Sequence, residues 1–477
     1  MNFKMIKNIL GWILIFEAGF MLIPFITALI YTEDVFLSYL ISIGICLLIG
    51  FLLIWKKPTD RTLYSRDGFV IVSLSWIILS IFGALPFFIS REIPHYVDAL
   101  FETVSGFTTT GASILSDVEA LSHASLMWRS FTHWVGGMGV LVFIMAFVPL
   151  SGGNNMHIMK AESPGPSVSK LVPRIKTTAM ILYLIYIVLT VIQIILLLCG
   201  GMNLFESLNA AFATAGTGGF SIKNDGFNGF SSYIQIVVTV FMLLFSINFA
   251  SFYLILLGRF KEAFTTEIRV FLGIFVSAVT IITLNTRGFF GTIGEAIKHV
   301  SFTVSSLFSS TGFSTVNFDL WPTLSKLCLI FVMFVGACAG STGGGIKVSR
   351  ILIFFKSISK ELHLMIHPKQ VKKIMIDKQP VEHEVVRATN VYMVCYLVFF
   401  AASIFLVSIE GYGLITNFTS VLATMNNIGP GLELVGPTQN FGFFNPFTKL
   451  VLIFDMLAGR LELFPMLLLF FRGTWKK

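Results

Sequence analysis

Four short stretches of this sequence share one composition, in which a semi-apolar segment runs into small hydroxyl-bearing residues and glycine. Glycine allows backbone angles at which consecutive carbonyl groups can face one way, and Ser and Thr add further oxygen ligands. A ring of backbone carbonyls can replace the hydration shell of a cation. The stretches therefore predict one cation filter, with four purely structural hairpins as the alternative. They read LFETVSGFTTTGAS (residues 100–113), LFESLNAAFATAGTGGFS (204–221), SFTVSSLFSSTGFSTVN (301–317) and NFTSVLATMNNIGPGL (417–432).

The composition predicts that a lipid bilayer surrounds these stretches. The chain has 477 residues, of which 55% are hydrophobic and 12% are charged, and its mean hydropathy is +0.84. A soluble protein carries about twice that charged fraction. Apolar runs such as residues 70–89, 181–199 and 234–257 are long enough to span a bilayer as helices.

The order of apolar and polar segments predicts a fourfold repeat. Each unit has a membrane helix, a half-helix, a glycine-bearing loop and a second membrane helix, and such irregular backbone at membrane depth must be buried or line a watery cavity. We expect an all-α polytopic membrane protein with four tandem helix–pore-loop–helix repeats around one pseudo-fourfold pore, preceded by two extra N-terminal transmembrane helices. The expected boundaries are 1–60 for these two helices and 61–165, 166–265, 266–375 (with the gating loop) and 376–477 for the repeats.

The distribution of positive charge predicts an orientation. The net charge is +8, and the basic residues cluster in alternate connections between the apolar spans. Placing every cluster on one side satisfies the positive-inside rule and puts both termini in the cytoplasm. Because the charge is explained in this way, we expect no nucleic acid partner. The clusters contain Lys4 and Lys7; Lys56, Lys57, Arg61 and Arg66; Lys170, Arg174 and Lys176; Arg259, Lys261 and Arg269; Lys356, Lys360, Lys369, Lys372 and Lys373; and Lys476 and Lys477.

The glycine run GACAGSTGGGIKVSR (residues 336–350) admits two interpretations. A nucleotide-using enzyme would need G-x-x-x-x-G-K-[ST] after a strand. Counted from Gly340, the second glycine is Gly345, but Ile346 takes the place of the lysine and an apolar, helix-like segment comes before it. No nucleophile–base constellation is evident either, so we expect no enzyme. Since a helix-interior glycine costs about 0.8–1 kcal/mol relative to alanine, residues 343–345 predict a break in the membrane helix that begins near Lys326.

These features together resemble one known family. The four loops, the glycine-interrupted segment 339–347 and DMLAGRLELFP (455–465) are similar to the Trk/Ktr/HKT superfamily of potassium transporters. WRSFTHWVGGMGVLVF (128–143) and the two N-terminal helices are most similar to its TrkH branch. The resemblance implies a K+-translocating, channel-like subunit of a bacterial K+ uptake system in the plasma membrane, with K+ as the transported ion and no organic cofactor in this chain. A Na+-permeable or K+/Na+-cotransporting member of the superfamily is the alternative. A secondary transporter of another fold usually shows two-part rather than four-part symmetry.

The resemblance assigns the filter strands residue by residue, as the metal-binding positions. Three of the filter glycines follow the phenylalanine at the start of their segment by 10, 10 and 11 residues, whereas Gly219 follows Phe205 by 14. We prefer Gly219 because Phe-Ser follows it, as it follows Gly312, and a register through Gly216 stays open. A serine in place of the first glycine is associated with sodium permeation in plant relatives, so Gly111 favours K+. The strands are Thr109-Thr110-Gly111, Thr217-Gly218-Gly219, Ser310-Thr311-Gly312 and Asn427-Ile428-Gly429.

The resemblance also implies a gate, an intramembrane loop that obstructs the path beneath the filter. Arg460 is an ionisable residue within the last membrane helix and so a functional candidate by default. The resemblance places it near the loop as an electrostatic barrier. The alternative is a snorkelling residue or a partner of Glu462, although residues two apart on a helix do not face each other. Lys347 and Arg350 lie at the exit of the loop, and whether a cytoplasmic partner pulls on them stays open. The predicted gate consists of Gly340, Ser341, Thr342, Gly343, Gly344, Gly345, Lys347 and Arg460.

Partners are also implied by the resemblance: a cytoplasmic nucleotide-binding subunit resembling TrkA, and a second copy in a homodimer. Residues 361–384 mix basic and apolar side chains, which fits either a docking surface or a solvated loop with lipid-headgroup contacts. We expect His123 and His133 at or near the outer surface. Glu102 and Glu206 lie early in the half-helices, where a carboxylate complements the helix dipole.

Overall fold

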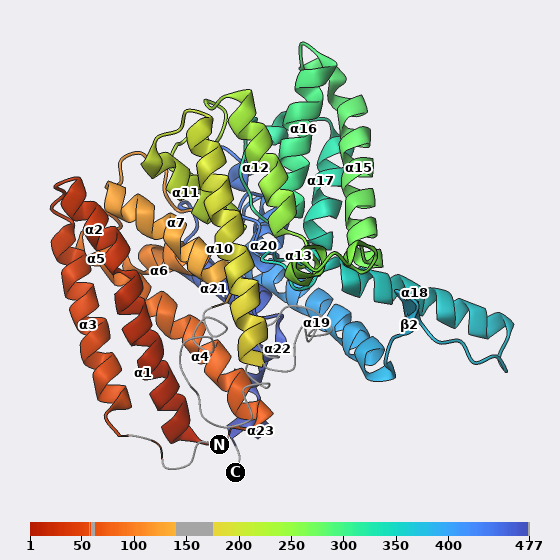
Figure 1. Cartoon of the computed structure of the whole chain (residues 1–477), viewed down its shortest axis with the longest axis horizontal. Helices are drawn as coiled ribbons and strands as arrows, with labels where there is room; N and C mark the ends of the chain where they lie inside the picture. The colour runs from red at the N-terminus through yellow and green to blue at the C-terminus, as the bar shows by residue number, and fades with distance from the viewer. Residues whose placement is uncertain (57, 59–62, 140–174, 476–477) are drawn as a thin grey trace.

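A computed structural model describes residues 1–56, 58, 63–139 and 175–475 of the chain. The predicted boundaries at residues 60 and 165, part of the segment 128–143, and Lys57, Arg61, Lys170, Arg174, Lys476 and Lys477 lie outside these residues. The described part is almost entirely helical, as expected (Figure 1). Six of its helices are long and apolar enough to cross a membrane, and a seventh candidate span is broken.

The N-terminal segment forms a helical layer at one side of the molecule (Figure 1). The first predicted helix is divided at Met21 into α1 (Phe3–Phe20) and α2 (Leu22–Ile30), and the second is α3 (Phe36–Ile54). α1 and α3 pack closely where Gly11 and Gly50 meet, because a Cβ on either glycine would lie within 3.0 Å of the other's carbonyl oxygen.

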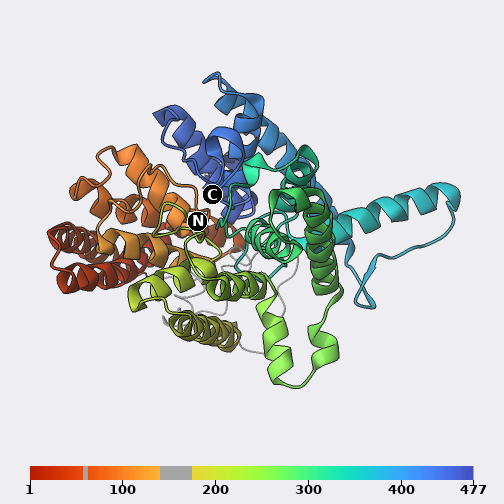
Figure 2. The same ribbon diagram turned by 90° about the horizontal axis from the view of Figure 1, so that it is seen from above.

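Four helical units follow one another around a common centre, which Figure 2 shows in chain order from orange through green to blue. Each unit contains an outer helix, a shorter helix that we call a pore helix, and an inner helix. The outer helices are α4 (Ser65–Gly83, continued by α5, Leu85–Ile89), α10 (Ile175–Cys199), α15 (Thr266–Thr286, continued by η1, Arg287–Phe289) and α19 (His383–Ser408). The pore helices are α6 (Tyr96–Phe107), α11 (Leu204–Ala215), α16 (Ile293–Phe308) and α20 (Leu414–Met425). The inner helices are α7 (His123–Gly137), α12 (Ser232–Phe245), α17 (Thr323–Val335) and α21 (Pro446–Arg460).

The units close on each other because each inner helix packs against the pore helix of the next unit. α7 contacts α11, α12 contacts α16, α17 contacts α20, and α21 returns to α6. Local signals start several of these helices: Ser231, Thr265, Thr292 and Asn445 each accept a hydrogen bond from a backbone amide of the first turn. Asn203 and Glu206 form a capping box at α11, so the expected role of Glu206 is confirmed.

Smaller elements connect the units. α12 is followed by α13 (Phe249–Leu256) after a bend of 94°, and then by α14 (Phe260–Ala263). α18 (Val348–Ile366) extends away from the rest of the molecule in both views (Figures 1 and 2). The all-α expectation did not include a two-stranded hairpin, which consists of β1 (Met375–Ile376) and β2 (Gln379–Pro380). Its tight turn is made by Asp377 and Lys378, which both have positive φ angles. The remaining pieces are η2 (Phe318–Leu320), η3 (Glu433–Val435), α22 (Phe464–Phe470) and α23 (Arg472–Trp475).

Candidate ion pathway

All four pore helices end in the same backbone motif. The second residue after each helix has a positive φ of 54° to 61°, although none of these four residues is glycine. The amide of the third residue then bonds back to a carbonyl of the last helical turn, at 2.8 to 2.9 Å, in the way of a Schellman cap. Positive φ is uncommon for residues with a side chain, so its recurrence at four equivalent positions indicates a shared function. The four residues are Thr109, Thr217, Ser310 and Asn427.

The sign of φ alternates along each of the predicted filter strands. The first residue of each strand has a positive φ, the middle residue does not, and the glycine that follows it again has a positive φ, of 76° to 97°. In a strand of constant sign, carbonyl groups alternate between the two sides, whereas a change of sign at successive residues can turn them to one side. The glycines are Gly111, Gly219, Gly312 and Gly429.

The four strands form a closed ring, which we call the four-loop ring. A Cβ built on each of the four glycines would lie within 3.0 Å of the carbonyl oxygen of the residue that precedes the glycine in another loop. This relation runs through all four loops and returns to the first, so the ring has approximate fourfold symmetry. The pairs are Gly111 with Gly218, Gly219 with Thr311, Gly312 with Ile428, and Gly429 with Thr110.

In the second loop, Gly219 and not Gly216 takes the position equivalent to the other three glycines. Gly216 has a φ of −70° and caps α11, and the turn that follows places Thr217 in the left-handed conformation. The longer spacing between Phe205 and Gly219 arises within the pore helix, because Phe205 is the second residue of α11, which continues to Ala215.

A polar cavity of about 200 Å³ lies on one side of the ring. All four ring glycines line it, together with the segments that follow them. Lys223 and Asn224 stand at its edge, and Asn224 Nδ2 donates to Asp117 Oδ1 at 2.8 Å. Backbone of the ring is therefore accessible from this side.

On its other side, the ring contacts the loop of residues 336–347, which joins α17 to α18. The amide of Gly344 donates to Ser310 Oγ at 2.5 Å. A Cβ on Gly344 would overlap the carbonyl oxygen of Asn426, and one on Gly343 would lie 2.7 Å from that of Ser309. The glycines therefore allow this loop to lie directly against the ends of two pore helices. The predicted helix break is present, but α17 already ends at Val335, well before the three glycines.

The 336–347 loop also bonds to the bend between α12 and α13. Cys338 N donates to Ser246 O at 3.1 Å, Thr342 Oγ1 donates to Phe245 O at 3.1 Å, and Phe249 N donates to Gly340 O at 3.0 Å. Interrupted helices at membrane depth need such partners for their free backbone groups. The break in the third unit and the bend in the second thus stabilise each other.

Arg460, at the end of α21, connects the same loop to the first unit. Its guanidinium donates to Thr342 O at 2.8 Å, and to Gly136 O and Gly137 O at 2.6 and 2.8 Å. Glu462, the alternative partner from the sequence, pairs with Arg350. Arg460 and the glycines of the loop line a second cavity of about 100 Å³.

The ends of the 336–347 loop are fixed by buried side chains. Glu267, in the first turn of α15, accepts from Ala339 N at 2.8 Å and from Ser349 N at 3.0 Å. Lys347 is only 2% exposed and donates to the carbonyl of Gly343. Arg350, at the exit of the loop, is also buried, against Glu462 and the ring of Tyr392.

Comparison with known proteins identifies the family. The family described as "TrkH: Cation transport protein" matches residues 38–474. The chain belongs to the TrkH family. It is 37% identical to the Trk system potassium uptake protein TrkH of Escherichia coli K12, with all of both chains covered, and 31% identical to TrkG of the same strain, with 99% of each covered. Its fold matches the crystal structure of the potassium transporter TrkH from Vibrio parahaemolyticus with a TM-score of 0.89 and 31% identity over the whole of both chains.

Membership of the TrkH family agrees with the prediction of a polytopic membrane transporter rather than an enzyme. The recognition of the TrkH branch from the four loops and the N-terminal helices is confirmed.

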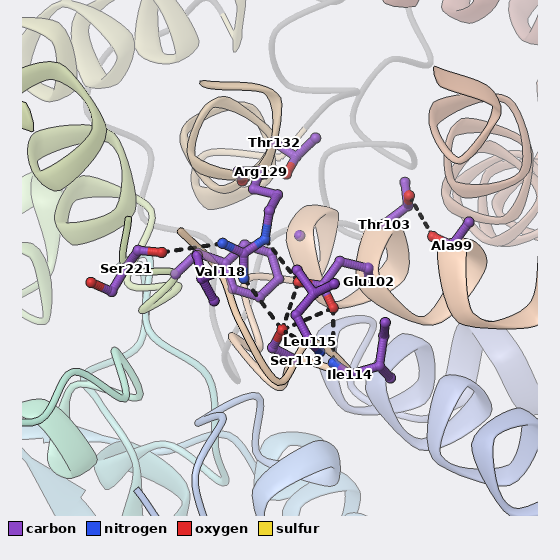
Figure 3. Close-up of polar contacts among 12 residues, drawn as sticks. Ala99, Glu102, Thr103, Ser113, Ile114, Leu115, Val118, Arg129, Thr132 and Ser221 are labelled. Carbon is purple, nitrogen blue, oxygen red and sulfur yellow. Dashed lines mark hydrogen bonds and ion pairs between the residues drawn. The ribbon is translucent and has the colours of Figure 1, made fainter. Parts of the chain in front are cut away.

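Glu102 of this TrkH-family chain has a different role from the one expected from sequence. Glu102 does not cap α6 but lies inside the protein, where it bonds to Arg129 Nε at 2.8 Å (Figure 3). The same carboxylate accepts from Ser113 Oγ at 2.9 Å and from Ile114 N at 3.0 Å, directly after the first filter strand. No local spacing rule predicts this pair, since its members lie 27 residues apart on two different helices.

The two histidines differ from expectation and from each other. His123 is half-exposed and its Nδ1 lies 2.9 Å from Glu33 Oε1, so it lies near a surface as expected. His133 is fully buried behind the second filter strand, which makes the surface assignment wrong. Helical geometry explains the difference, because a rise of 1.5 Å per residue places His133 about 15 Å further along α7 than His123, which lies at the start of the helix.

Proposed function

We propose that this chain is the K+-translocating, channel-like subunit of a bacterial K+ uptake system. The observation that carries the proposal is the four-loop ring, which brings four equivalent glycine-containing strands together around one centre. K+ is large and weakly hydrated enough for backbone carbonyls to replace its water shell, as in other potassium-selective filters. The relatives named as potassium uptake proteins support this choice of ion.

The proposed filter consists of the twelve residues predicted from sequence, with the carbonyl oxygens as ligands. The non-glycine members are fully buried, which keeps the strands in place around an ion. Gly111 supports K+ over Na+ because its close approach to Gly218 O leaves no room for a side chain. A Na+-permeable or K+/Na+-cotransporting protein is the alternative, and the two differ in the measured flux ratio.

The proposed gate is the 336–347 loop together with Arg460. The loop lies against the inner ends of two filter strands, and the guanidinium places a positive charge beside the second cavity. A positive charge on the path of a cation raises the barrier to its passage. Displacement of the loop from Ser310 and Arg460 would open the path.

The proposed setting is a bacterial plasma membrane with both termini in the cytoplasm. The start of α1 and the short helix α23 lie at the same end of the molecule, which supports one side for both (Figure 1). The proposed partners are a second copy and a cytoplasmic nucleotide-binding subunit resembling TrkA. Exposed apolar side chains on the projecting α18, such as Phe355, Leu362 and Met365, favour contact of this arm with another protein.

Flux into proteoliposomes tests the proposal. The purified chain is reconstituted, and uptake of K+, Rb+ and Na+ is measured with and without a TrkA-type subunit. We expect K+ and Rb+ to pass well above Na+, and empty liposomes to pass neither. Equal fluxes of K+ and Na+ would favour the alternative, and no flux under any condition would reject the transport function.

A further inference from the structure

Two buried polar side chains of α7 point at the second filter strand. Arg129 and His133 are four residues apart and so lie on the same face of the helix. Arg129 is 2% exposed and His133 is completely buried. Neither belongs to the filter, yet both bond to residues that directly follow it.

His133 joins the first pore helix to the second filter strand. Its Nδ1 lies 2.8 Å from the carbonyl oxygen of Gly106, so this nitrogen carries a proton and donates. The other nitrogen, Nε2, then accepts from the amide of Phe220 at 3.2 Å. Phe220 is the residue after Gly219, so the imidazole holds the outer end of the strand.

The imidazole also occupies the space where a filter side chain would lie. The residue before the ring glycine is Thr110, Thr311 or Ile428 in three loops, but Gly218 in the second. A Cβ on Gly218 would overlap the ring of His133. With Gly218 and Gly219, this strand has two glycines where each of the others has one, so its backbone has the most freedom of the four. An external support is therefore needed here more than in the other loops.

Arg129 joins the same strand to the first loop. Its Nη1 donates to Ser221 O at 3.1 Å, its Nη2 donates to Ser113 Oγ at 3.4 Å, and its guanidinium carbon lies 4.0 Å from the ring centre of Phe220. Ser113 and Ser221 are equivalent, since each is the second residue after its ring glycine. The planar fork of arginine suits such a bridge between two neighbouring loops (Figure 3).

The charge of Arg129 is balanced where it lies. Glu102 bonds to its Nε at 2.8 Å, and both side chains are buried. Because an uncompensated positive charge here would repel a cation in the ring, the carboxylate is needed for the guanidinium to support the strand. Glu102 is itself fixed by Ser113 and Ile114.

We propose that Arg129 and His133 form a bracket that holds the second filter strand at the spacing of the other three, and that they are specificity-determining positioning residues. This inference rests on the proposed K+ function of the ring. Without the bracket, this strand with its two glycines would relax around the ion. A ring of variable size no longer favours K+ over the smaller Na+, so selectivity is lost before folding is.

The test compares ion ratios of four variants with a matched control. His133→Leu removes the acceptor for Phe220 N, and Arg129→Gln removes the fork; each is expected to reduce the Rb+/Na+ flux ratio by about tenfold or more. His133→Gln and Arg129→Lys keep part of the bonding and are expected to lower it by a few-fold. The control is Trp128→Phe, which removes a buried hydrogen bond from the same helix to Gly83 O of the outer helix α4, at 3.0 Å, and leaves the bonds of Arg129 and His133 in place; its ratio should not change.

A second measurement separates positioning from general stability. The shift of the thermal unfolding midpoint produced by K+, relative to Na+, should shrink in the bracket variants and persist in Trp128→Phe. Unchanged ratios in His133→Gln and Arg129→Lys would overturn the bracket even if the two stronger variants do not fold, and so would an equal loss of the ratio in Trp128→Phe. Equal K+ and Na+ fluxes in the unmodified protein would instead reject the proposed K+ selectivity of the ring, and the bracket proposal that rests on it.

Discussion

Removal of the Arg460 side chain is expected to raise basal K+ flux. Three hydrogen bonds join its guanidinium to backbone carbonyls, and one of these, to Thr342 O, holds the 336–347 loop directly. The other two hold the end of α7, at Gly136 and Gly137, and need not break when the loop moves. If the proposed gate opens by movement of this loop, the bond to Thr342 is therefore the one that distinguishes the closed from the open arrangement.

The size of the effect follows from that one bond. A hydrogen bond to a charged group contributes about 1.5–3 kcal/mol, so its loss shifts the closed–open equilibrium by a factor of roughly 10 to 150. The positive charge beside the cavity is lost as well, which lowers the barrier further. We expect Arg460→Ala to increase basal flux by at least about tenfold, and Arg460→Lys, which keeps the charge, by less.

The assay is K+ uptake by proteoliposomes without a regulatory subunit, normalised to folded protein. Arg259→Ala is the control, since it removes an exposed arginine paired with Glu262 that lies outside the pathway. Arg460 does not hold the pathway closed if folded Arg460→Ala passes K+ no faster than the unmodified protein, or if Arg259→Ala is equally accelerated.

Three further outcomes follow from the pathway. Gly111→Ser should lower the K+/Na+ flux ratio by about tenfold or more, because the new Cβ meets Gly218 O. The control is Gly201→Ser, which is also at positive φ but has open space around it and should keep the ratio. The same ratio in both variants would contradict this prediction. Ser310→Ala removes the acceptor of the Gly344 amide and should raise basal flux by about five- to twelvefold, for a bond of about 1–1.5 kcal/mol, whereas unchanged flux would argue against contact between loop and filter. Glu267→Ala leaves two backbone amides of the loop region without their acceptor, and should both raise basal flux and lower the midpoint of thermal unfolding in detergent; a change in neither would exclude Glu267 as an anchor.

Much of the architecture could be predicted because its signals are local. Long apolar runs give the membrane helices, and the repeated glycine-bearing stretches give the pore helices with their loops. The position of the filter glycine was less certain in the second loop, because Gly216 and Gly219 offer the same conformational freedom. The choice between them depends on the left-handed conformation of Thr217, which sequence spacing does not report.

The deviations arise where tertiary contacts override local preference. α17 ends at Val335, before the glycine triplet, because the following backbone groups find partners in Ser246, Glu267 and other residues of distant helices. Lys347 closely follows the glycines in sequence, and the fold of the loop buries its side chain. The position of a residue along the chain indicates whether it lies near the membrane boundary. It does not indicate in which direction the backbone runs there, or whether the side chain is buried.

The supporting residues of the filter were hidden for a related reason. Arg129 and His133 lie in a segment that resembles the TrkH branch, yet their partners Ser221 and Phe220 are about ninety residues away. One signal was present in the sequence: Gly218 stands where the other loops have Thr or Ile. A missing side chain at one of four equivalent positions indicates that another part of the protein fills the space.

Anomalous diffraction from crystals grown with Rb+ tests the central claim most directly. If the four-loop ring selects K+, a Rb+ peak should lie on its axis, at coordination distance from the carbonyl oxygens of Thr110, Gly218, Thr311 and Ile428, and excess K+ but not Na+ should remove it. Absence of Rb+ from the ring at saturating concentration, or equal displacement by Na+, would contradict the account.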